Sequence, residues 1–140
     1  MLKIEIRKEH LEEIIKHCSE VYPEECCGLL VGKRCGEKIV VEDFKSTANV
    51  FEGDRRFRYT IDPKEYLEVD RIASEKGLEI VGAFHSHTFY GVNPSLKDLE
   101  LAIPTYVYLI ISFLGIHVNF KAWMINEHLK SFSEVVIETV

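Results

Sequence analysis

The sequence predicts an α/β fold in which a mixed β-sheet is flanked by helices. Three observations favour this class. Some segments repeat apolar residues with helical spacing, others are short apolar or alternating runs typical of strands, and turns containing glycine, proline or asparagine separate them. The 140 residues suit a single domain spanning residues 1–140, without repeats or linkers.

Three helices are predicted. Residues 8–21 place apolar side chains at positions i, i+3, i+4 and i+7, so one face of this helix is expected to pack against the sheet. Asp62 and Pro63 suit the N-cap and the first position of a second helix, which is expected to end before Gly77. A short third helix is expected to begin at Ser95.

The predicted strands share either a nearly continuous apolar run, typical of a buried strand, or an alternation of apolar and polar residues, typical of a half-buried one. They are residues 27–32, 39–44, 57–61, 78–87, 106–113 and 118–122. The tail, residues 129–140, is expected to be extended and to form a last edge strand.

Composition and charge argue against several kinds of partner. The net charge of −6 and the pI near 5.5 disfavour non-specific binding to nucleic acids, which relies on neutralising phosphates. The chain lacks an apolar run of about 18 residues, and Met1–Glu5 lacks the apolar core of a signal peptide. We therefore expect a cytoplasmic protein with neither a membrane nor a nucleic-acid partner.

One stretch, Arg55–Arg58, is locally basic. The simpler interpretation is a solvated face of the protein. The alternative is a rim that attracts an acidic partner, and the sequence leaves both open.

The four cysteines are Cys18, Cys26, Cys27 and Cys35. They contain no C-x-x-C pair, so a zinc site built from four thiolates is not expected. Cys18 falls on the apolar face of the first helix and is expected in the core, whereas Cys35 lies in a predicted turn. Disulfides occur inside the cells of hyperthermophiles, so the pairing of these cysteines stays open.

The residues that point most directly to chemistry form the pattern H-x-H-x7-S-x-x-D, made by His85, His87, Ser95 and Asp98. Residues two apart in a strand project from the same face, so both imidazoles can reach one divalent cation. Asp98, in the first turn of the third helix, would supply a third ligand. Three protein ligands leave the fourth position of a tetrahedral zinc site open for hydrolytic chemistry.

These residues also have simpler interpretations. Ser95 and Asp98 match the capping box [ST]-x-x-[DE], in which the aspartate accepts a hydrogen bond at the start of the helix instead of binding a metal.

Glu25 is the candidate general base. It precedes an apolar strand and would act on the water of a nearby metal site. Composition alone does not place it near His85, and it would otherwise be a surface carboxylate.

Taken together, five residues resemble the JAMM motif of the MPN+ metalloproteases: Glu25, His85, His87, Ser95 and Asp98. Three surrounding segments are similar to that family as well, namely residues 23–32, 61–63 and 80–87. The resemblance covers nearly the whole chain and is greater to the small prokaryotic members than to the eukaryotic ones.

This resemblance implies a compact α/β domain similar to that of cytidine deaminases. It implies one Zn²⁺ per chain bound by His85, His87 and Asp98, with Glu25 activating the zinc-bound water and Ser95 stabilising the oxyanion. The implied activity is hydrolysis of a peptide or isopeptide bond at the C-terminus of a ubiquitin-like or sulfur-carrier protein. Those proteins and their conjugates are the expected partners, while the particular modifier, the linkage and the oligomeric state stay open.

The chain departs from the family pattern in two places. Thr88 stands where many members have proline, and the segment after Asp98 is too short for the substrate-clamping insertion of eukaryotic deubiquitinases. The second departure puts recognition of particular ubiquitin linkages in doubt. Phe89 and Tyr90 are expected either to pack against a substrate tail or to be ordinary loop aromatics.

Two other functions fit the sequence less well than hydrolysis of amides. A zinc nucleoside deaminase would carry H-x-E and P-C-x-x-C at its metal, whereas this chain has H-x-H there and no C-x-x-C. A non-catalytic scaffold of the same family would lack metal ligands, yet every ligand position and the glutamate are present.

Overall fold

The computed structural model describes residues 2–126 and 128–140. Seven strands and three helices form within these residues. In chain order they are β1 (Lys3–Ile6), α1 (Lys8–Val21), β2 (Cys27–Cys35), β3 (Lys38–Thr47), α2 (Pro63–Glu75), β4 (Glu79–His87), α3 (Leu96–Leu101), β5 (Val107–Ser112), β6 (Asn119–Asn126) and β7 (Ser131–Thr139).

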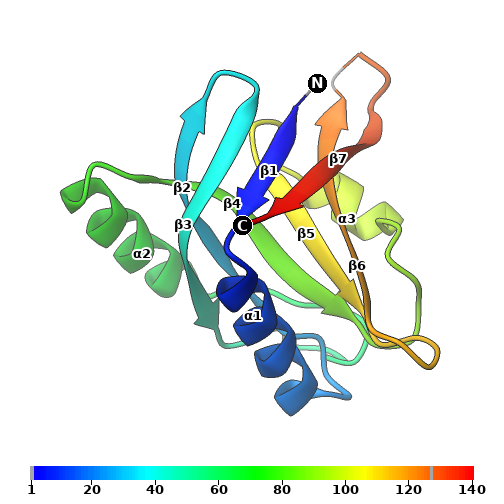
Figure 1. Cartoon of the computed structure of the whole chain (residues 1–140). Helices are drawn as coiled ribbons and strands as arrows, with labels where there is room; N and C mark the ends of the chain where they lie inside the picture. The colour runs from blue at the N-terminus through cyan, green and yellow to red at the C-terminus, as the bar shows by residue number, and fades with distance from the viewer. Residues whose placement is uncertain (1, 127) are drawn as a thin grey trace.

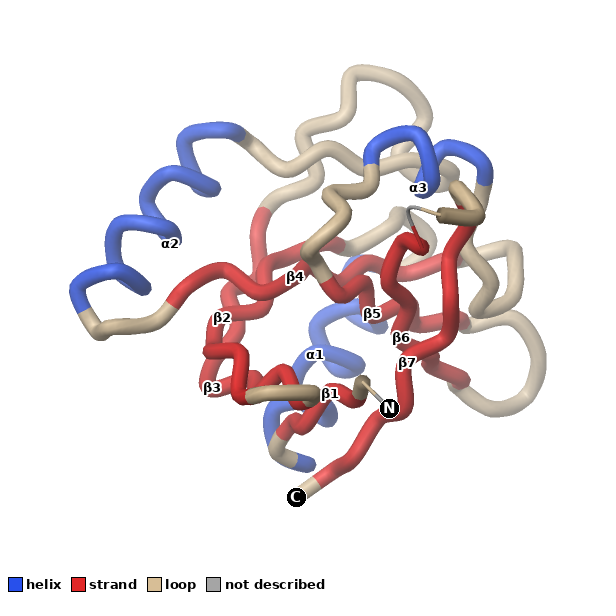
Figure 2. The backbone as a smooth tube through the Cα atoms, turned by 90° about the horizontal axis from the view of Figure 1, so that it is seen from above, coloured by secondary structure: helices blue, strands red, loops and turns tan. Residues whose placement is uncertain are grey.

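The strands close into a barrel (Figures 1 and 2). Their order is β1-β3-β2-β4-β5-β6-β7, and β1 completes the ring because it pairs in parallel with both β3 and β7. Ile4, for example, pairs with Ile39 on one side and with Ile137 on the other. The C-terminal strand is therefore not the edge strand that the sequence suggests.

The expectation of a cytidine-deaminase-like domain is thus wrong, although the chain is an α/β protein with mixed strand pairing. The domain is a small closed barrel with three helices. The difference arises from β1, which is four residues long and too short for hydrophobic periodicity to identify. Without this strand, β7 would have one neighbour and the sheet would be open.

Both long helices lie where their sequence signals predict. The side chain of Asp62 accepts a hydrogen bond from the backbone N–H of Lys64 at 2.9 Å, as expected of an N-cap. Gly77 follows the end of α2 with φ of 72°, a left-handed conformation that favours glycine. No helix in the described part of the chain is long and apolar enough to cross a membrane.

Residues 57–61, predicted as a strand, belong to a loop. Ile61 makes only an isolated bridge to Asn49. The alternation that suggested a strand comes from Phe57 and Tyr59, whose side chains line one cavity. The alternation at Phe57 and Tyr59 therefore arises because both side chains face the same cavity, and not because the segment pairs as a strand.

Two apolar clusters pack on the two faces of β4. One contains buried residues of α1 together with Phe84, and the other contains Val69 and Ala73 of α2 together with Ala83. Figure 1 shows α1 and α2 on different sides of the strands. Neighbouring residues of β4 thus contact different helices, as alternation along a strand requires.

A bulge in β4 sets which face the histidines occupy. Leu30 of β2 pairs with Gly82 and Val31 pairs with Ile80, so Val81 is an extra residue in β4. After the bulge the alternation resumes through Ala83 to His85 and His87 on one face, with Ser86 on the other. The bulge and the pairing with β2 therefore determine where the H-x-H segment points.

Candidate metal centre

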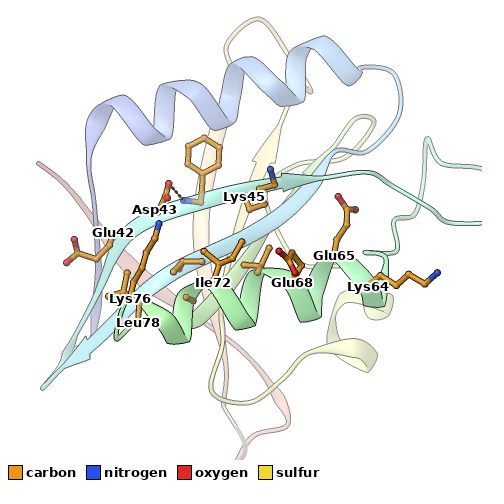
Figure 3. Close-up of a pocket in the computed structure, with 13 residues that line it drawn as sticks. Glu42, Asp43, Lys45, Lys64, Glu65, Glu68, Ile72, Lys76 and Leu78 are labelled. Atoms are coloured by element: carbon orange, nitrogen blue, oxygen red, sulfur yellow. Dashed lines mark hydrogen bonds between the residues drawn. The ribbon is translucent and has the colours of Figure 1, made fainter.

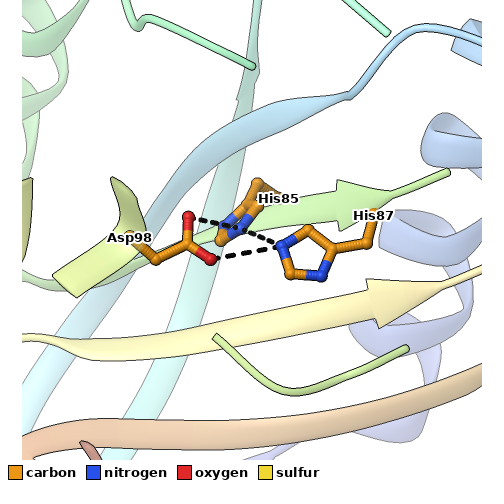
Figure 4. Close-up of side chains that lie close together, drawn as sticks. All are labelled: His85, His87 and Asp98. Atoms are coloured by element: carbon orange, nitrogen blue, oxygen red, sulfur yellow. Dashed lines mark hydrogen bonds and ion pairs between the residues drawn. The ribbon is translucent and has the colours of Figure 1, made fainter. Parts of the chain in front are cut away.

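Three side chains that can bind a metal converge where the end of β4 meets the start of α3 (Figure 4). Nε2 of His85 lies 3.2 Å from Nε2 of His87. Each of these nitrogens also lies 3.2 Å from one oxygen of Asp98, Oδ1 for His85 and Oδ2 for His87. The structure thus brings together the three residues that the sequence predicts as ligands.

These separations fit a tetrahedral metal site. Ligand atoms about 2.0–2.1 Å from a zinc ion, at tetrahedral angles, lie about 3.3 Å from one another. Here the two Nε2 atoms are 3.2 Å apart, and each lies 3.2 Å from one of the two oxygens of Asp98. Two imidazole nitrogens and a carboxylate are also a donor set that zinc prefers. We conclude that the residues present suit one divalent cation.

Contacts outside this triad hold both imidazole rings. Nδ1 of His87 lies 2.8 Å from the carbonyl oxygen of Gly91, an acceptor that places the ring hydrogen on Nδ1 and leaves the Nε2 lone pair for a metal. His85 stacks on Tyr59, with ring centroids 4.5 Å apart and planes 26° from parallel. Nδ1 of His85 has no hydrogen-bond partner among the described residues, so stacking orients this ring.

The capping role and the ligand position of Asp98 coexist. Oδ2 of Asp98 accepts a hydrogen bond from the backbone N–H of Ser95 at 2.8 Å, and the backbone N–H of Asp98 donates to Oγ of Ser95 at 3.1 Å. This is the complete capping box. It fixes the carboxylate so that its two oxygens face the two imidazoles. The cap therefore orients the carboxylate and does not compete with metal binding.

The charges of the triad depend on one another. Burial raises the pKa of Asp98, but the neighbouring His85 and His87 and the Ser95 amide outweigh burial, so the net pKa is lowered. Burial lowers the pKa of His85, against the opposing effect of Asp98. Burial also acts to lower the pKa of His87, yet its bonds to Asp98 and Gly91 raise it overall. Asp98 is accordingly an anion, and a proton on His87 competes with a metal cation.

Glu25, on the segment before β2, is 3% exposed and lines the same cavity as His87 and Asp98. Burial raises the pKa of Glu25 to about 8, with His87 opposing the rise and Asp98 adding to it. Cys27 pairs with His85 across β2 and β4, which brings the glutamate to the histidines. The surface carboxylate considered from sequence is therefore a buried group beside the triad.

Two polar residues that the sequence analysis did not select hold Glu25 in place. Oγ of Ser86 accepts a hydrogen bond from the backbone N–H of Cys26 at 2.8 Å. Nδ2 of Asn49 donates to the carbonyl oxygens of Glu25 and Arg58, both at 3.0 Å. Only the folded chain brings these partners together, since they lie 60, 24 and 9 positions apart.

Asn49 also organises the loop that precedes α2. Its Oδ1 accepts hydrogen bonds from the backbone N–H groups of Phe51, at 3.1 Å, and Thr60, at 3.2 Å. Thr88, which replaces the family's proline, donates from Oγ1 to the carbonyl oxygen of Arg56 at 2.8 Å. The loop is thus tied to the Glu25 segment through Asn49 and to the H-x-H segment through Thr88.

The cavity at the triad is small, about 60 Å³. Its lining residues come from the Glu25 segment, the loop before α2, β4 and its following loop, and α3: Glu25, Phe51, Phe57, Arg58, Tyr59, Thr60, His87, Tyr90, Ser95, Lys97, Asp98 and Leu101. Six of these side chains are aromatic or long cationic groups.

A larger groove of about 720 Å³ lies between α2 and strand β3 (Figure 3). Both acidic and basic side chains line it, including Glu42, Lys45, Glu68 and Lys76. None of its lining residues belongs to the predicted site. The larger groove is therefore separate from the residues that could bind a metal.

The cysteines take three different states. Cys18 and Cys26 form a disulfide that links α1 to the residue after Glu25. Cys27 is buried, and burial raises its pKa to about 11 despite a hydrogen bond from Thr47. Cys35 is exposed, as its predicted turn suggested. A thiol with a raised pKa is a poor nucleophile, so Cys27 does not supply one beside Glu25.

Comparisons with known proteins agree with the pattern in this site. Residues 7–126 match the family described as prokaryotic homologs of the JAB domain. A desampylase from Pyrococcus furiosus is 33% identical over 133 residues, which cover 94% of this chain and 87% of that protein. A desampylase from Haloferax volcanii is 34% identical over 91 residues, covering 64% of this chain and 63% of its own.

Solved structures show the same fold. A protein from Desulfitobacterium hafniense superimposes with a TM-score of 0.86 at 30% identity, covering 98% of this chain and 92% of that one. A protein from Salinibacter ruber gives a TM-score of 0.71 at 29% identity, with the same two coverages. The chain therefore belongs to the prokaryotic JAB-domain family, among the JAMM-type isopeptidases.

Proposed function

We propose that this protein is a zinc-dependent hydrolase that cleaves a peptide or isopeptide bond at the C-terminus of a ubiquitin-like or sulfur-carrier protein. The observation that carries the proposal is the convergence of His85, His87 and Asp98, beside a cavity that Glu25 and Ser95 line together with His87 and Asp98. The desampylase relatives support the choice of substrate class.

We assign the metal to the triad on the basis of its donor atoms and their spacing. A Zn²⁺ ion held by His85, His87 and Asp98 would polarise the scissile carbonyl and lower the pKa of a water molecule towards about 7. The buried carboxylate and the two neutral imidazoles leave one net positive charge on such a centre. Asp98 and the capping box of α3 keep the donor atoms in place.

Glu25 is the proposed general base and acid. It accepts a proton from the attacking water and delivers that proton to the amine nitrogen of the leaving group. Because burial raises its pKa to about 8, this carboxyl group both gains and releases a proton near neutral pH. A nearby dication would lower that value and favour the base form before attack.

Ser95 is the proposed donor to the carbonyl oxygen as negative charge accumulates on it. Its Oγ already accepts a hydrogen bond from the backbone N–H of Asp98, so the hydroxyl hydrogen remains free to donate. A donor in this role commonly lowers the barrier by about 3 kcal/mol. The three functions together suffice for amide hydrolysis without a nucleophilic side chain.

The proposal is tested by incubating the protein with the source organism's own ubiquitin-like proteins, both conjugated and fused, with and without a chelator. Mass spectrometry locates the cut. We expect cleavage after the last residue of the modifier, loss of cleavage with the chelator, and recovery with zinc. Glu25→Gln should keep its zinc and lose at least about 100-fold in turnover.

A matched control is Glu24→Gln, which removes the neighbouring carboxylate and should leave turnover unchanged. Near-normal zinc-dependent turnover in Glu25→Gln would exclude Glu25 as the base. Cleavage that survives complete removal of metal would exclude the mechanism as a whole.

A further inference from the structure

We infer that Arg58 binds a carboxylate of the substrate on the leaving-group side of the scissile amide. This inference rests on the proposed function and specifies which amides the site prefers. Of the two interpretations of the basic stretch Arg55–Arg58, it favours a rim that attracts an acidic partner over a solvated face.

Arg58 is a cation at the catalytic cavity without an acidic partner among the described residues. Its side chain lines the cavity, and its guanidinium carbon lies 5.4 Å from the centroid of the Phe51 ring. The neighbouring Arg56 is instead paired with Asp54 at 2.6 Å. A guanidinium that stacks on an aromatic ring keeps its planar hydrogen-bond donors available for a carboxylate.

Lys97, the other cation of the cavity, already has an acidic partner. Its Nζ lies 3.2 Å from Oε2 of Glu100 on the same helix. The two acids of the cavity, Glu25 and Asp98, belong to the proposed metal centre and do not pair with Arg58. The uncompensated positive charge at the rim is therefore that of Arg58, and a carboxylate brought by the substrate would neutralise it.

The backbone places Arg58 on the side of the leaving group. The carbonyl oxygens of Glu25 and Arg58 accept hydrogen bonds from the same Asn49 amide, so these two residues lie side by side. Ser95 enters the cavity from another element, α3. Since Glu25 delivers the proton to the leaving amine, the leaving group occupies the side of the site that Arg58 shares with Glu25.

The loop that carries Arg58 is held in advance of binding. The backbone N–H of Val50 donates to the carbonyl oxygen of Thr60 at 2.9 Å, and Thr88 donates to the carbonyl oxygen of Arg56 at 2.8 Å. Asn49 adds four further hydrogen bonds. A cation on a held loop loses less conformational freedom on binding, which favours selectivity for a charged group.

Two sources supply the same carboxylate chemistry. One is the free α-carboxylate of a single amino acid attached to the modifier. The other is an acidic side chain close to the acceptor amine of a larger protein. A charge-assisted bond to arginine at a partly exposed rim is expected to change binding by about tenfold.

The test measures binding to Glu25→Gln protein loaded with zinc, so that turnover does not interfere. Three peptides carry the C-terminal tail of the organism's ubiquitin-like protein, extended by serine with a free carboxylate, by serine carboxamide, or by aspartate carboxamide. We expect the first or the third to bind about ten times more tightly than serine carboxamide, and the stronger of the two identifies the source of the carboxylate.

Adding Arg58→Gln should bring that ratio close to one, and Arg58→Lys should restore part of it. Arg34→Gln makes the same change of charge at the far end of β2 and should keep the ratio. Equal binding of all three peptides, or a ratio unchanged by Arg58→Gln, would overturn the inference. Loss of the proposed function would look different, because the wild-type protein would then cleave neither these peptides nor folded conjugates.

Discussion

The buried carboxyl group of Glu25 should make the metal-free protein less stable as pH rises. The perturbation is Glu25→Gln, which keeps the shape and removes the charge. In the folded protein burial raises the pKa of Glu25 from 4.5 to about 8. The unfolded chain therefore loses the proton near pH 4.5, while the folded chain keeps it until about pH 8.

The folded and unfolded states bind different numbers of protons, and this difference makes stability depend on pH. Between these pKa values the folded state binds more protons than the unfolded state, so the free energy of unfolding decreases as pH rises. From the two pKa values, ionisation of Glu25 lowers the free energy of unfolding by about 1 kcal/mol at pH 5 and by about 4 kcal/mol at pH 8, compared with a side chain that does not titrate. The wild type should therefore lose about 3 kcal/mol relative to Glu25→Gln over this range.

Urea unfolding followed by circular dichroism, on chelator-treated protein at several pH values between about 5 and 8, measures the difference. Glu20→Gln, at an exposed position of α1, is the control and should follow the wild type. Zinc should reduce the difference, because a dication favours the ionised carboxylate. Parallel curves for wild type and Glu25→Gln without metal would refute the burial of this group beside the triad.

Three other changes test the supports of the site. Cys18→Ser opens the disulfide to Cys26, which spans eight positions, and should lower the free energy of unfolding by about 2–3 kcal/mol in denaturant melts without reductant. Gly28→Ala places a Cβ against the ring of Phe84 and should lower the free energy of unfolding by at least about 1–3 kcal/mol. An unchanged melting temperature would contradict the packing of β2 on β4. Asn49→Ala removes four hydrogen bonds, and we expect a loss of about 2–4 kcal/mol together with a fall in turnover that exceeds any change in zinc affinity.

The helices could be predicted from the sequence because their signals are local. Asp62, Pro63 and Gly77 each act within a turn of their own position, and the structure places α2 between them. The closure of the barrel could not be predicted in this way. It depends on the pairing of Lys3–Ile6 with strands about 35 and 133 positions later in the chain, as the registers show.

The triad could also be predicted from the sequence, because its three residues are close together in the chain. His85 and His87 are two positions apart in one strand, and Asp98 follows in the next helix. The position of Glu25 instead depends on the pairing of β2 with β4, and without the family resemblance it would have remained a surface carboxylate. Asn49 carried no signal, because its role comes from four partners that only the fold assembles.

In the proposed metal centre, His85, His87 and Asp98 hold one divalent cation beside Glu25. Calorimetric titration of metal-free protein with zinc tests it most directly, with His87→Ala as the disrupted site and His117→Ala, at an exposed position, as the control. We predict one site per chain in the wild type and the control, and loss of that site in His87→Ala. Equally tight binding of one zinc ion by His87→Ala would contradict the claim.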